Sequence, residues 1–425
     1  MSETGRLLEG GVAHPPPDDP GAVPVPPAVR QERIERLRAA ARERDLAAVV
    51  IFSYGGRSSA GTHGHLRYLL DWTSGGGCAM LLLPVDGPPA VVVPAPFDPP
   101  WMRELCPWIE EVYLEGPGAQ PRVARALLER RGITGRIGLI GVQALPHGAY
   151  ADMLAPDPRW EFEPIDEVLH RQRTVKDAIA LARLRRAAAI CDTMFEALVE
   201  ALRVPGMPIW KAQATMQAVA ELEGAETVSG WMSAGSAPDR TRTRREENLA
   251  PLRPGDRVTA SIIMTYAGYY GHALRMFTIG DPTPEHERVW RAVSEAQTAA
   301  ADLLRPGENA RLITPTAEEA LFRRFPEARE ADRRRFQVAH FTGLDYAEFP
   351  TGIVGRAPGH DRFFAAPPGA FQDVPLEAGM TIELHPNIWA PGLGFGAVGD
   401  VFLVTPEGGE RLNRFPTGLQ AVAPR

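Results

Sequence analysis

The segment GDRVTASIIMTYAGYYGHALR, residues 255–275, places residues that could do chemistry in a pattern typical of a β-hairpin. It predicts one strand over Arg257–Met264, an Ala-Gly turn, and a second strand over Tyr269–Arg275. Folding the strands together brings Ser261 and His272 near each other, although eleven residues separate them. On this segment alone, His272 could be an exposed histidine at the end of a loop or one ligand of a metal ion.

Composition limits the classes of protein that this chain can belong to. Its 425 residues exceed one core of ordinary size, so we expect two domains. The net charge of −7 comes without a long basic block, which predicts no nucleic-acid partner. No run of about 18 apolar residues occurs, so we expect no membrane span. The N-terminus lacks a secretion pattern, and three widely spaced cysteines are typical of free thiols, so we expect a cytoplasmic protein.

Lysine is scarce, which bears on mechanism. Of the 46 basic residues only Lys176 and Lys211 are lysines. Few amines are therefore available for a Schiff base. We predict neither pyridoxal phosphate nor a nucleotide as cofactor.

The first part of the chain predicts a Pro-rich, extended or disordered lead-in over residues 1–28 and an α/β domain over residues 29–168. Apolar runs and helical spacing alternate through that domain. The predicted strands are Leu46–Ser53, Cys78–Val85, Ala90–Ala95 and Arg136–Gly141, and the predicted helices are Gln31–Asp45 and Gln120–Arg131.

A loop rich in Gly, Ser and His lies between Tyr54 and Gly77 and contains His63 and His65. Two histidines two residues apart suit a metal only if a strand holds them. A surface loop is the simpler interpretation, and a loop that closes over the active site of another domain or subunit is a third.

Residues 169–425 predict paired helices followed by paired strands, and this pattern occurs twice, as in an α+β unit with an internal duplication. The predicted helices are Thr174–Leu202, Ile209–Glu223, Pro284–Leu304 and Thr316–Phe325. The predicted strands after the hairpin are Gln337–Gly343, Met380–Trp389 and Val398–Thr405.

Five motifs in this region resemble, in order and spacing, those of the creatinase, prolidase and aminopeptidase P family. They are RQRTVKD from Arg171, RPGDRV followed by AGYYGHALR, AHFTGLD from Ala339, PLEAGMTIELHP from Pro375, and AVGDVFLVTPEG. The resemblance implies the α+β pita-bread fold for the catalytic domain, preceded by a smaller α/β domain of creatinase type. It also implies a homodimer.

The resemblance implies a changed metal site. Metal-dependent members hold two divalent ions with Asp, Asp, His, Glu and Glu. The corresponding residues here are Ser261, His272, His340, His385 and Gly399. Two dications about 3.5–4 Å apart need bridging carboxylates, so a two-ion site is not expected. We predict one divalent transition metal, Fe or Zn, held by the three histidines, with Gly399 leaving an opening.

Other site residues are predicted around this centre. Alternation puts Glu383 and His385 on one strand face, where Glu383 could orient that ligand or pair with an arginine. The catalytic candidates are Arg275, Glu383 and Tyr346, with Asp400 as a further acid–base candidate. The substrate-binding candidates are Arg240, Arg242, Ser261 and Glu348.

The function implied is action on a small amino-acid-like or amide substrate, with hydrolytic C–N cleavage as the default and iron-dependent oxidation as another reaction. The family's second histidine is replaced by Ala347, and residues 233–248 hold no histidine, so an ordinary dipeptidase is not expected. A metal-free, creatinase-like amidinohydrolase and a non-catalytic binding protein remain as alternatives.

Overall fold

The computed structural model describes residues 21, 23–55, 64–74, 77–116, 118–142, 145–238, 249–331, 338–348 and 374–425. They include two compact units, an N-terminal unit over Pro24–Arg173 and a C-terminal unit over Thr174–Arg425. The domain boundaries 28/29 and 168/169 stay predictions. No helix in the described part of the chain is both long and apolar enough to cross a membrane.

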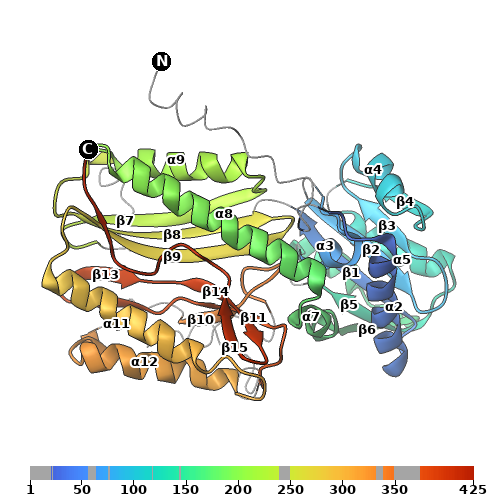
Figure 1. Ribbon diagram of the computed structural model, residues 1–425. Helices are drawn as coiled ribbons and strands as arrows, with labels where there is room; N and C mark the ends of the chain where they lie inside the picture. The colour runs from blue at the N-terminus through green and yellow to red at the C-terminus, as the bar shows by residue number, and fades with distance from the viewer. Residues whose placement is uncertain are drawn as a thin grey trace. The chain divides into compact units, whose positions relative to one another are not determined.

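The N-terminal unit is built on a six-stranded mixed sheet with the order β4-β3-β2-β1-β5-β6 (Figure 1). Its strands are β1 (Ala48–Gly55), β2 (Gly77–Pro84), β3 (Ala90–Val93), β4 (Glu111–Leu114), β5 (Gly135–Ile140) and β6 (Trp160–Pro164). The central strands read as continuous apolar runs because both of their faces are buried. The four predicted strands are confirmed, each with ends shifted by a few residues.

Helices connect these strands. They are α2 (Pro27–Glu43), α3 (Gly64–Leu70), α4 (Asp98–Leu105), α5 (Gln120–Arg130), α6 (His147–Met153) and α7 (Asp166–Thr174). Three of them, α2, α4 and α5, carry proline in the first turn, where the missing N–H would have no intrahelical partner.

The first half of the C-terminal unit packs two helices on a sheet of order β16-β9-β8-β7 (Figure 1). Its elements are α8 (Ala178–Leu202), α9 (Ile209–Leu222), β7 (Thr227–Gly235), β8 (Arg257–Tyr266), β9 (Tyr269–Ile279) and β16 (Gln420–Val422). Their shared core includes Phe195, Met216 and Phe277. Residues from β9 are buried along its whole length, which places this strand in the middle of the unit.

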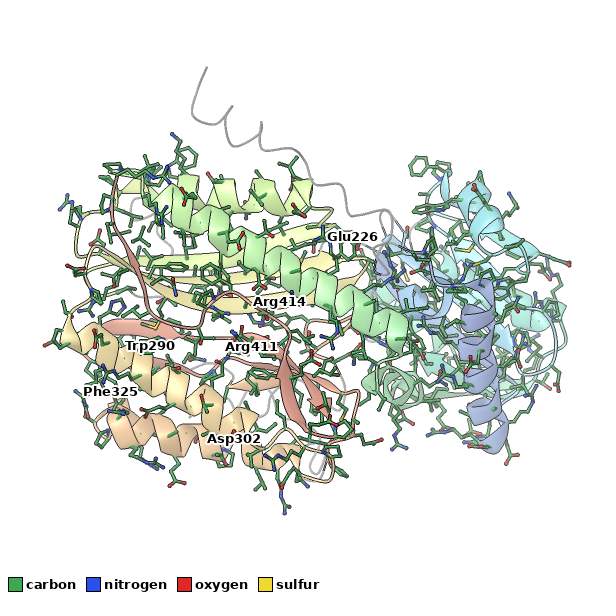
Figure 2. The ribbon with its side chains drawn as sticks, in the orientation of Figure 1. Glu226, Trp290, Asp302, Phe325, Arg411 and Arg414 are labelled. Atoms are coloured by element: carbon green, nitrogen blue, oxygen red, sulfur yellow. The ribbon has the colours of Figure 1, made fainter. Side chains whose placement is uncertain are left out.

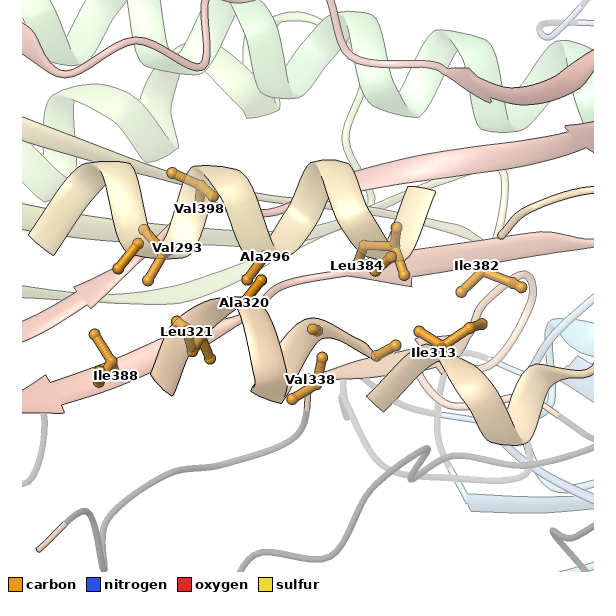
Figure 3. Close-up of a cluster of buried hydrophobic side chains, with 14 of the residues drawn as sticks. Val293, Ala296, Ile313, Ala320, Leu321, Val338, Ile382, Leu384, Ile388 and Val398 are labelled. Atoms are coloured by element: carbon orange, nitrogen blue, oxygen red, sulfur yellow. The ribbon is translucent and has the colours of Figure 1, made fainter. Parts of the chain in front are cut away.

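The second half repeats the plan with α11 (Pro284–Ala301) and α12 (Ile313–Arg324) against a sheet of order β10-β11-β14-β15. Its other elements are η2 (Ala310–Leu312), α13 (Ala328–Ala331), β10 (Ala339–Phe341), β11 (Thr381–Leu384), β12 (Asn387–Ala390), β13 (Gly394–Ala397), β14 (Asp400–Thr405) and β15 (Gly408–Arg411). In the core, small Ala296 and Ala320 lie between the two helices among Val293, Leu321 and Leu384 (Figure 3). Small side chains at the crossing permit close helix packing.

Backbone hydrogen bonds along β9 join the two halves. The Tyr270 N–H donates to the Gly343 carbonyl at 2.8 Å, and Leu274 and Gly399 exchange two bonds of 3.0 and 3.1 Å. Strand β9 is therefore bonded to β8 on one side, and on the other side to β16 and to residues of the second half. Its side chains can meet those of β10, β11 and β14.

One sequence prediction is wrong in detail: the strand predicted over Met380–Trp389 is two strands. β11 pairs with β10 and β14, whereas β12 forms a separate hairpin with β13. Pro386 stands at the break, since proline lacks the N–H that a continuous ladder needs. His385 therefore lies at the end of β11 and not within a longer strand.

Candidate metal centre

The hairpin of β8 and β9 sets the positions of Ser261 and His272. Ala267 and Gly268 have φ angles of 47° and 83°, and a two-residue type I′ turn requires positive φ at both positions. The Glu226 carboxylate, labelled in Figure 2, accepts a hydrogen bond from the Gly268 N–H at 2.8 Å. Ser261 and His272 are diagonal neighbours on one face of the hairpin, and Ser261 Oγ lies 3.4 Å from His272 Nε2.

His340 lies on β10 directly opposite Glu383 on β11, so the two side chains share one face of the sheet. Its Nδ1 is 3.0 Å from the Phe341 carbonyl oxygen, which can only accept, so Nδ1 carries the hydrogen. The Nε2 atom keeps its lone pair, is buried, and has no hydrogen-bond partner among the described residues. Burial lowers the pKa of His340 to about 4, which keeps the ring neutral at pH 7.

His385 completes a cluster of three buried imidazoles. Its backbone N–H donates to the Val338 carbonyl at 2.8 Å, which fixes its place at the end of β11. The ring centroids lie 5.7 Å apart for His272–His340, 5.3 Å for His272–His385 and 5.2 Å for His340–His385. Three imidazoles bound to one tetrahedral zinc have ring centroids about 5 Å apart. We call His272, His340 and His385 the histidine cluster.

Glu383 brings a carboxylate to the histidine cluster. Its Oε1 lies 3.6 Å from His272 Nδ1, and neither carboxylate oxygen has a hydrogen-bond partner among the described residues. Complete burial raises the pKa of Glu383 well above its usual range, with a smaller contribution from Asp400 and an opposing one from Arg275. A carboxylate buried without hydrogen bonds is costly, so this site favours a bound cation or a proton.

Arg275 has partners for every N–H donor of its guanidinium. The acceptors are the carboxylate of Asp400 at 2.6 Å and the carbonyl oxygens of Leu274, Gly399, Phe415 and Pro416 at 2.7–2.9 Å. Arg411, which is labelled in Figure 2, lies 3.7 Å from the same Asp400 carboxylate. Arg275 therefore holds backbone and Asp400 in place, and this geometry does not favour the catalytic role predicted for it.

The opening predicted at Gly399 is not present. A Cβ atom at this position would lie 2.4 Å from Leu274 Cδ1, 2.9 Å from Glu383 Oε1 and 2.9 Å from His385 Cβ. Neighbouring side chains already fill the space that a side chain at 399 would need. The prediction is wrong because it considered the lost side chain without the neighbours that replace it.

Two further predicted site residues are Tyr346, which contacts the histidine cluster, and Glu348, which follows Tyr346 by two residues. The Tyr346 ring centroid is 4.4 Å from that of His340 and 5.2 Å from that of His272. Glu348 is buried in an ion pair with Lys176 at 2.7 Å and also accepts from the Leu344 N–H at 3.1 Å. These bonds give Glu348 a role in holding the segment that carries Tyr346. Its predicted substrate contact stays a prediction.

Two predicted substrate-binding residues, Arg240 and Arg242, lie outside the described residues, as does His63 of the early loop. Two partners of buried carboxylates were not identified from the sequence, Lys176 for Glu348 and Gln297 for Asp400. Lys176 stood in a quoted motif without a role, and Gln297, which donates to Asp400 at 2.9 Å, carried no sequence signal at all.

A second group of ligand-type atoms lies in the N-terminal unit, where His65, Asp166 and His170 come within 4.8 Å of one another. Arg173 Nη1 lies 3.3 Å from His65 Nδ1. An arginine can only donate, so Nδ1 accepts and the neutral His65 ring carries its hydrogen on Nε2. This tautomer and the guanidinium charge favour a hydrogen-bonded cluster over a cation site.

The ligand atoms of the histidine cluster are not all within 4.8 Å of one another, unlike those of His65, Asp166 and His170, but their chemical types suit a single first-row divalent metal. Neutral imidazoles suit zinc, iron, copper or nickel, and a neighbouring carboxylate lowers the net charge of the centre. The His340 lone pair and the Glu383 oxygens are buried atoms that a metal ion would satisfy. The residues do not fit two ions, because no pair of bridging carboxylates lines the cluster in the described part of the chain.

Comparisons with known proteins agree with this architecture. The sequence pattern of metallopeptidase family M24 matches residues 182–406. The probable dipeptidase PepE of Mycobacterium tuberculosis is 28% identical over 257 residues, which cover 60% of this chain and 63% of that protein. The chain thus spans less than two thirds of that relative. The agropine synthesis cyclase of Rhizobium rhizogenes is 28% identical over 330 residues, 73% of this chain and 78% of that protein.

The fold matches over a longer stretch. The crystal structure of dipeptidase PepE from Mycobacterium ulcerans superposes with a TM-score of 0.72 and 25% identity, covering 94% of this chain and all of that one. The α+β fold class, with an α/β domain before the catalytic domain, is thereby confirmed.

Proposed function

Since the chain belongs to metallopeptidase family M24, we propose that it is a hydrolase of a small dipeptide-like or amide substrate that works at a mononuclear metal centre held by the histidine cluster. One observation carries the proposal: three buried imidazole rings lie with centroids 5.2–5.7 Å apart. His340 offers a buried lone pair there that no described residue uses.

The residues of this centre have distinct tasks in the proposed reaction. A divalent metal, when bound, supplies Lewis acidity toward the scissile carbonyl and toward water. His272 and His340 are oriented by Ser261 and by the Phe341 carbonyl, and the carbonyl also fixes the tautomer of His340. The Tyr346 ring packs on both of these histidines, where its hydroxyl could move a proton.

Metal content and activity test this proposal together. Protein purified without a histidine tag is expected to contain about one zinc or iron per chain by elemental analysis, and to cleave a panel of dipeptides and N-acyl amino acids. His385→Ala is expected to lose both properties. Full turnover in the presence of a strong chelator would instead support the metal-free alternative. The proposal fails if no metal binds after reconstitution.

The second candidate reaction is the cyclisation of a small substrate. It is favoured by the similarity to agropine synthesis cyclase, which extends over more of this chain than the similarity to PepE. Intramolecular condensation is hydrolysis in reverse and benefits from a site that excludes water, as this buried cluster does. Substrates carrying both a carboxylate and a hydroxyl or amine separate the candidates, since the product is then a ring and not two fragments.

Homodimer formation belongs to the same proposal. Gel filtration with light scattering is expected to give twice the chain mass of 46.3 kDa. A monomer would remove the dimer from the proposal and leave the metal centre unaffected.

A further inference from the structure

We propose that Glu383 is the fourth protein ligand of the metal centre, and that it supplies from β11 the carboxylate that position 399 no longer provides. The inference rests on the proposed mononuclear centre and specifies its ligand set as three imidazoles and one carboxylate. It differs from the role predicted from sequence, in which Glu383 acts as a catalytic residue or orients another ligand.

The first observation is the state of the Glu383 carboxylate. It is fully buried, and neither oxygen has a hydrogen-bond partner among the described residues. Buried polar groups are nearly always satisfied, and one left without partners marks a place where something else binds. Asp400, on the adjacent strand and equally buried, shows the ordinary solution, since Arg275 and Gln297 both donate to it.

The second observation is the distance between Glu383 and His272. Oε1 and Nδ1 are 3.6 Å apart, which is too long for a good hydrogen bond. Two ligand atoms that share one tetrahedral ion at metal–ligand distances near 2.1 Å lie about 3.4 Å apart. His272 Nε2 faces Ser261 Oγ at 3.4 Å, so Nδ1 is the ring nitrogen that faces the Glu383 carboxylate.

The third observation is the position of Glu383 relative to the other ligands. It pairs directly with His340 across β10 and β11, so both side chains leave the sheet on the same face. It also precedes His385 by two residues. Glu383 therefore shares a sheet face with His340 and strand parity with His385.

The fourth observation explains the glycine at 399. A Cβ there would lie 2.9 Å from Glu383 Oε1, closer than real Cβ contacts. The Glu383 carboxylate thus occupies space that a side chain at 399 would need. A side chain at 399 would therefore require the Glu383 carboxylate to move from its present position.

Metal affinity of the apoprotein is the test. The protein is stripped with a chelator and titrated with Zn²⁺ against a competing indicator dye. Glu383→Gln keeps the shape of the side chain and is expected to weaken Zn²⁺ binding by more than about 100-fold, beyond the 10–100-fold typical of a group that only orients a ligand. His385→Ala is the positive control, and Glu410→Gln, a half-exposed carboxylate paired with Arg185, is the neutral control.

Gly399→Ala supplies an independent variant that removes no ligand. Its methyl group would displace the Glu383 carboxylate, so Zn²⁺ affinity is expected to fall at least tenfold while the fold persists by circular dichroism. Loading with Co²⁺ gives a spectroscopic readout, because the visible absorption of Co²⁺ depends on its ligands. Both variants are expected to change that spectrum relative to the wild type.

The outcomes separate this inference from the proposed function. If the wild type binds no metal, the metal centre itself fails. If the wild type binds Zn²⁺ while Glu383→Gln binds it within threefold and gives an unchanged Co²⁺ spectrum, only the role of Glu383 is wrong. In that case a proton, and not a metal, neutralises the carboxylate.

Discussion

Glu383 and Asp400 are neighbouring carboxylates with opposite surroundings. They lie on the paired strands β11 and β14, where Leu384 is opposite Asp400, and both are fully buried. Asp400 accepts from Arg275 at 2.6 Å and from Gln297 at 2.9 Å. Glu383 has no hydrogen-bond partner among the described residues.

Two histidines repeat the same contrast. His286 on α11 and His340 on β10 are both buried, and burial lowers the pKa of each to about 4. His286 Nδ1 is 2.6 Å from Thr278 Oγ1, whereas His340 Nε2 has no such partner in the described residues. A buried charge or lone pair that the chain satisfies stabilises the fold. One that the chain leaves unsatisfied needs an explanation, such as an ion, a water molecule or a catalytic role.

The largest loss of unfolding free energy is expected from breaking the ion pair of Asp400 and Arg275. Asp400→Asn leaves the Arg275 charge buried without its counterion, so the unfolding free energy should fall by about 3–5 kcal/mol. Glu383→Gln changes a buried carboxyl group that accepts no hydrogen bond from the described residues, and it should leave the metal-free protein unchanged or more stable. Denaturant unfolding in the presence of a chelator measures both. Equal losses would show that the two carboxylates do not differ as described.

An intermediate loss of unfolding free energy is expected at acidic pH, through the protonation of His286. The unfolded pKa of histidine is about 6.5 and the folded pKa of His286 is about 4. The unfolded chain binds the proton more tightly, so the contribution of His286 is complete above pH 6.5. It is lost as the pH falls toward 4, by up to about 3 kcal/mol.

His286→Gln isolates this contribution, because it keeps a polar group near Thr278 and cannot titrate. The difference in unfolding free energy between wild type and variant should shrink as the pH falls from 7 to 4. A difference that stays constant over this range would mean that His286 is not buried in its neutral form.

The smallest loss of unfolding free energy is expected for Ser261, which contacts a residue of the histidine cluster. Ser261→Ala removes the partner of His272 Nε2, a single hydrogen bond at 3.4 Å, and should cost about 1 kcal/mol of unfolding free energy. The same change should weaken Zn²⁺ binding by roughly tenfold, because the His272 ring loses a hydrogen-bond partner that orients it. The Ser261→Thr variant keeps the hydroxyl and serves as the control. Unchanged affinity in Ser261→Ala would exclude an orienting role.

Much of the fold could be predicted from local patterns. The hairpin was recognisable because an Ala-Gly pair separates two apolar runs, and its observed strands, β8 and β9, contain the predicted ones. The paired helices α8, α9, α11 and α12 followed from apolar spacing, and prolines precede α9 and begin α11. Such signals depend on residues close in sequence, which is why they are reliable.

The site could be predicted only in part. The resemblance located three histidines that the structure brings together, although they lie on separate elements. The occupancy of the space at Gly399 depends on Leu274 and Glu383, which come from two other strands. Four of the five bonds of Arg275 likewise reach residues more than a hundred positions away. No local pattern encodes such contacts.

The bonds of Arg275 also affect when the C-terminal unit can fold. Its guanidinium binds the carbonyls of Phe415 and Pro416, and β16 then pairs with β9 in parallel, with Gln420 opposite Phe277. During synthesis, β9 leaves the ribosome roughly 140 residues before these partners do. Closing so long a loop is slow and entropically unfavourable. The sheet of the first half therefore stays incomplete, with a buried arginine uncompensated, until residues 415–422 have been made.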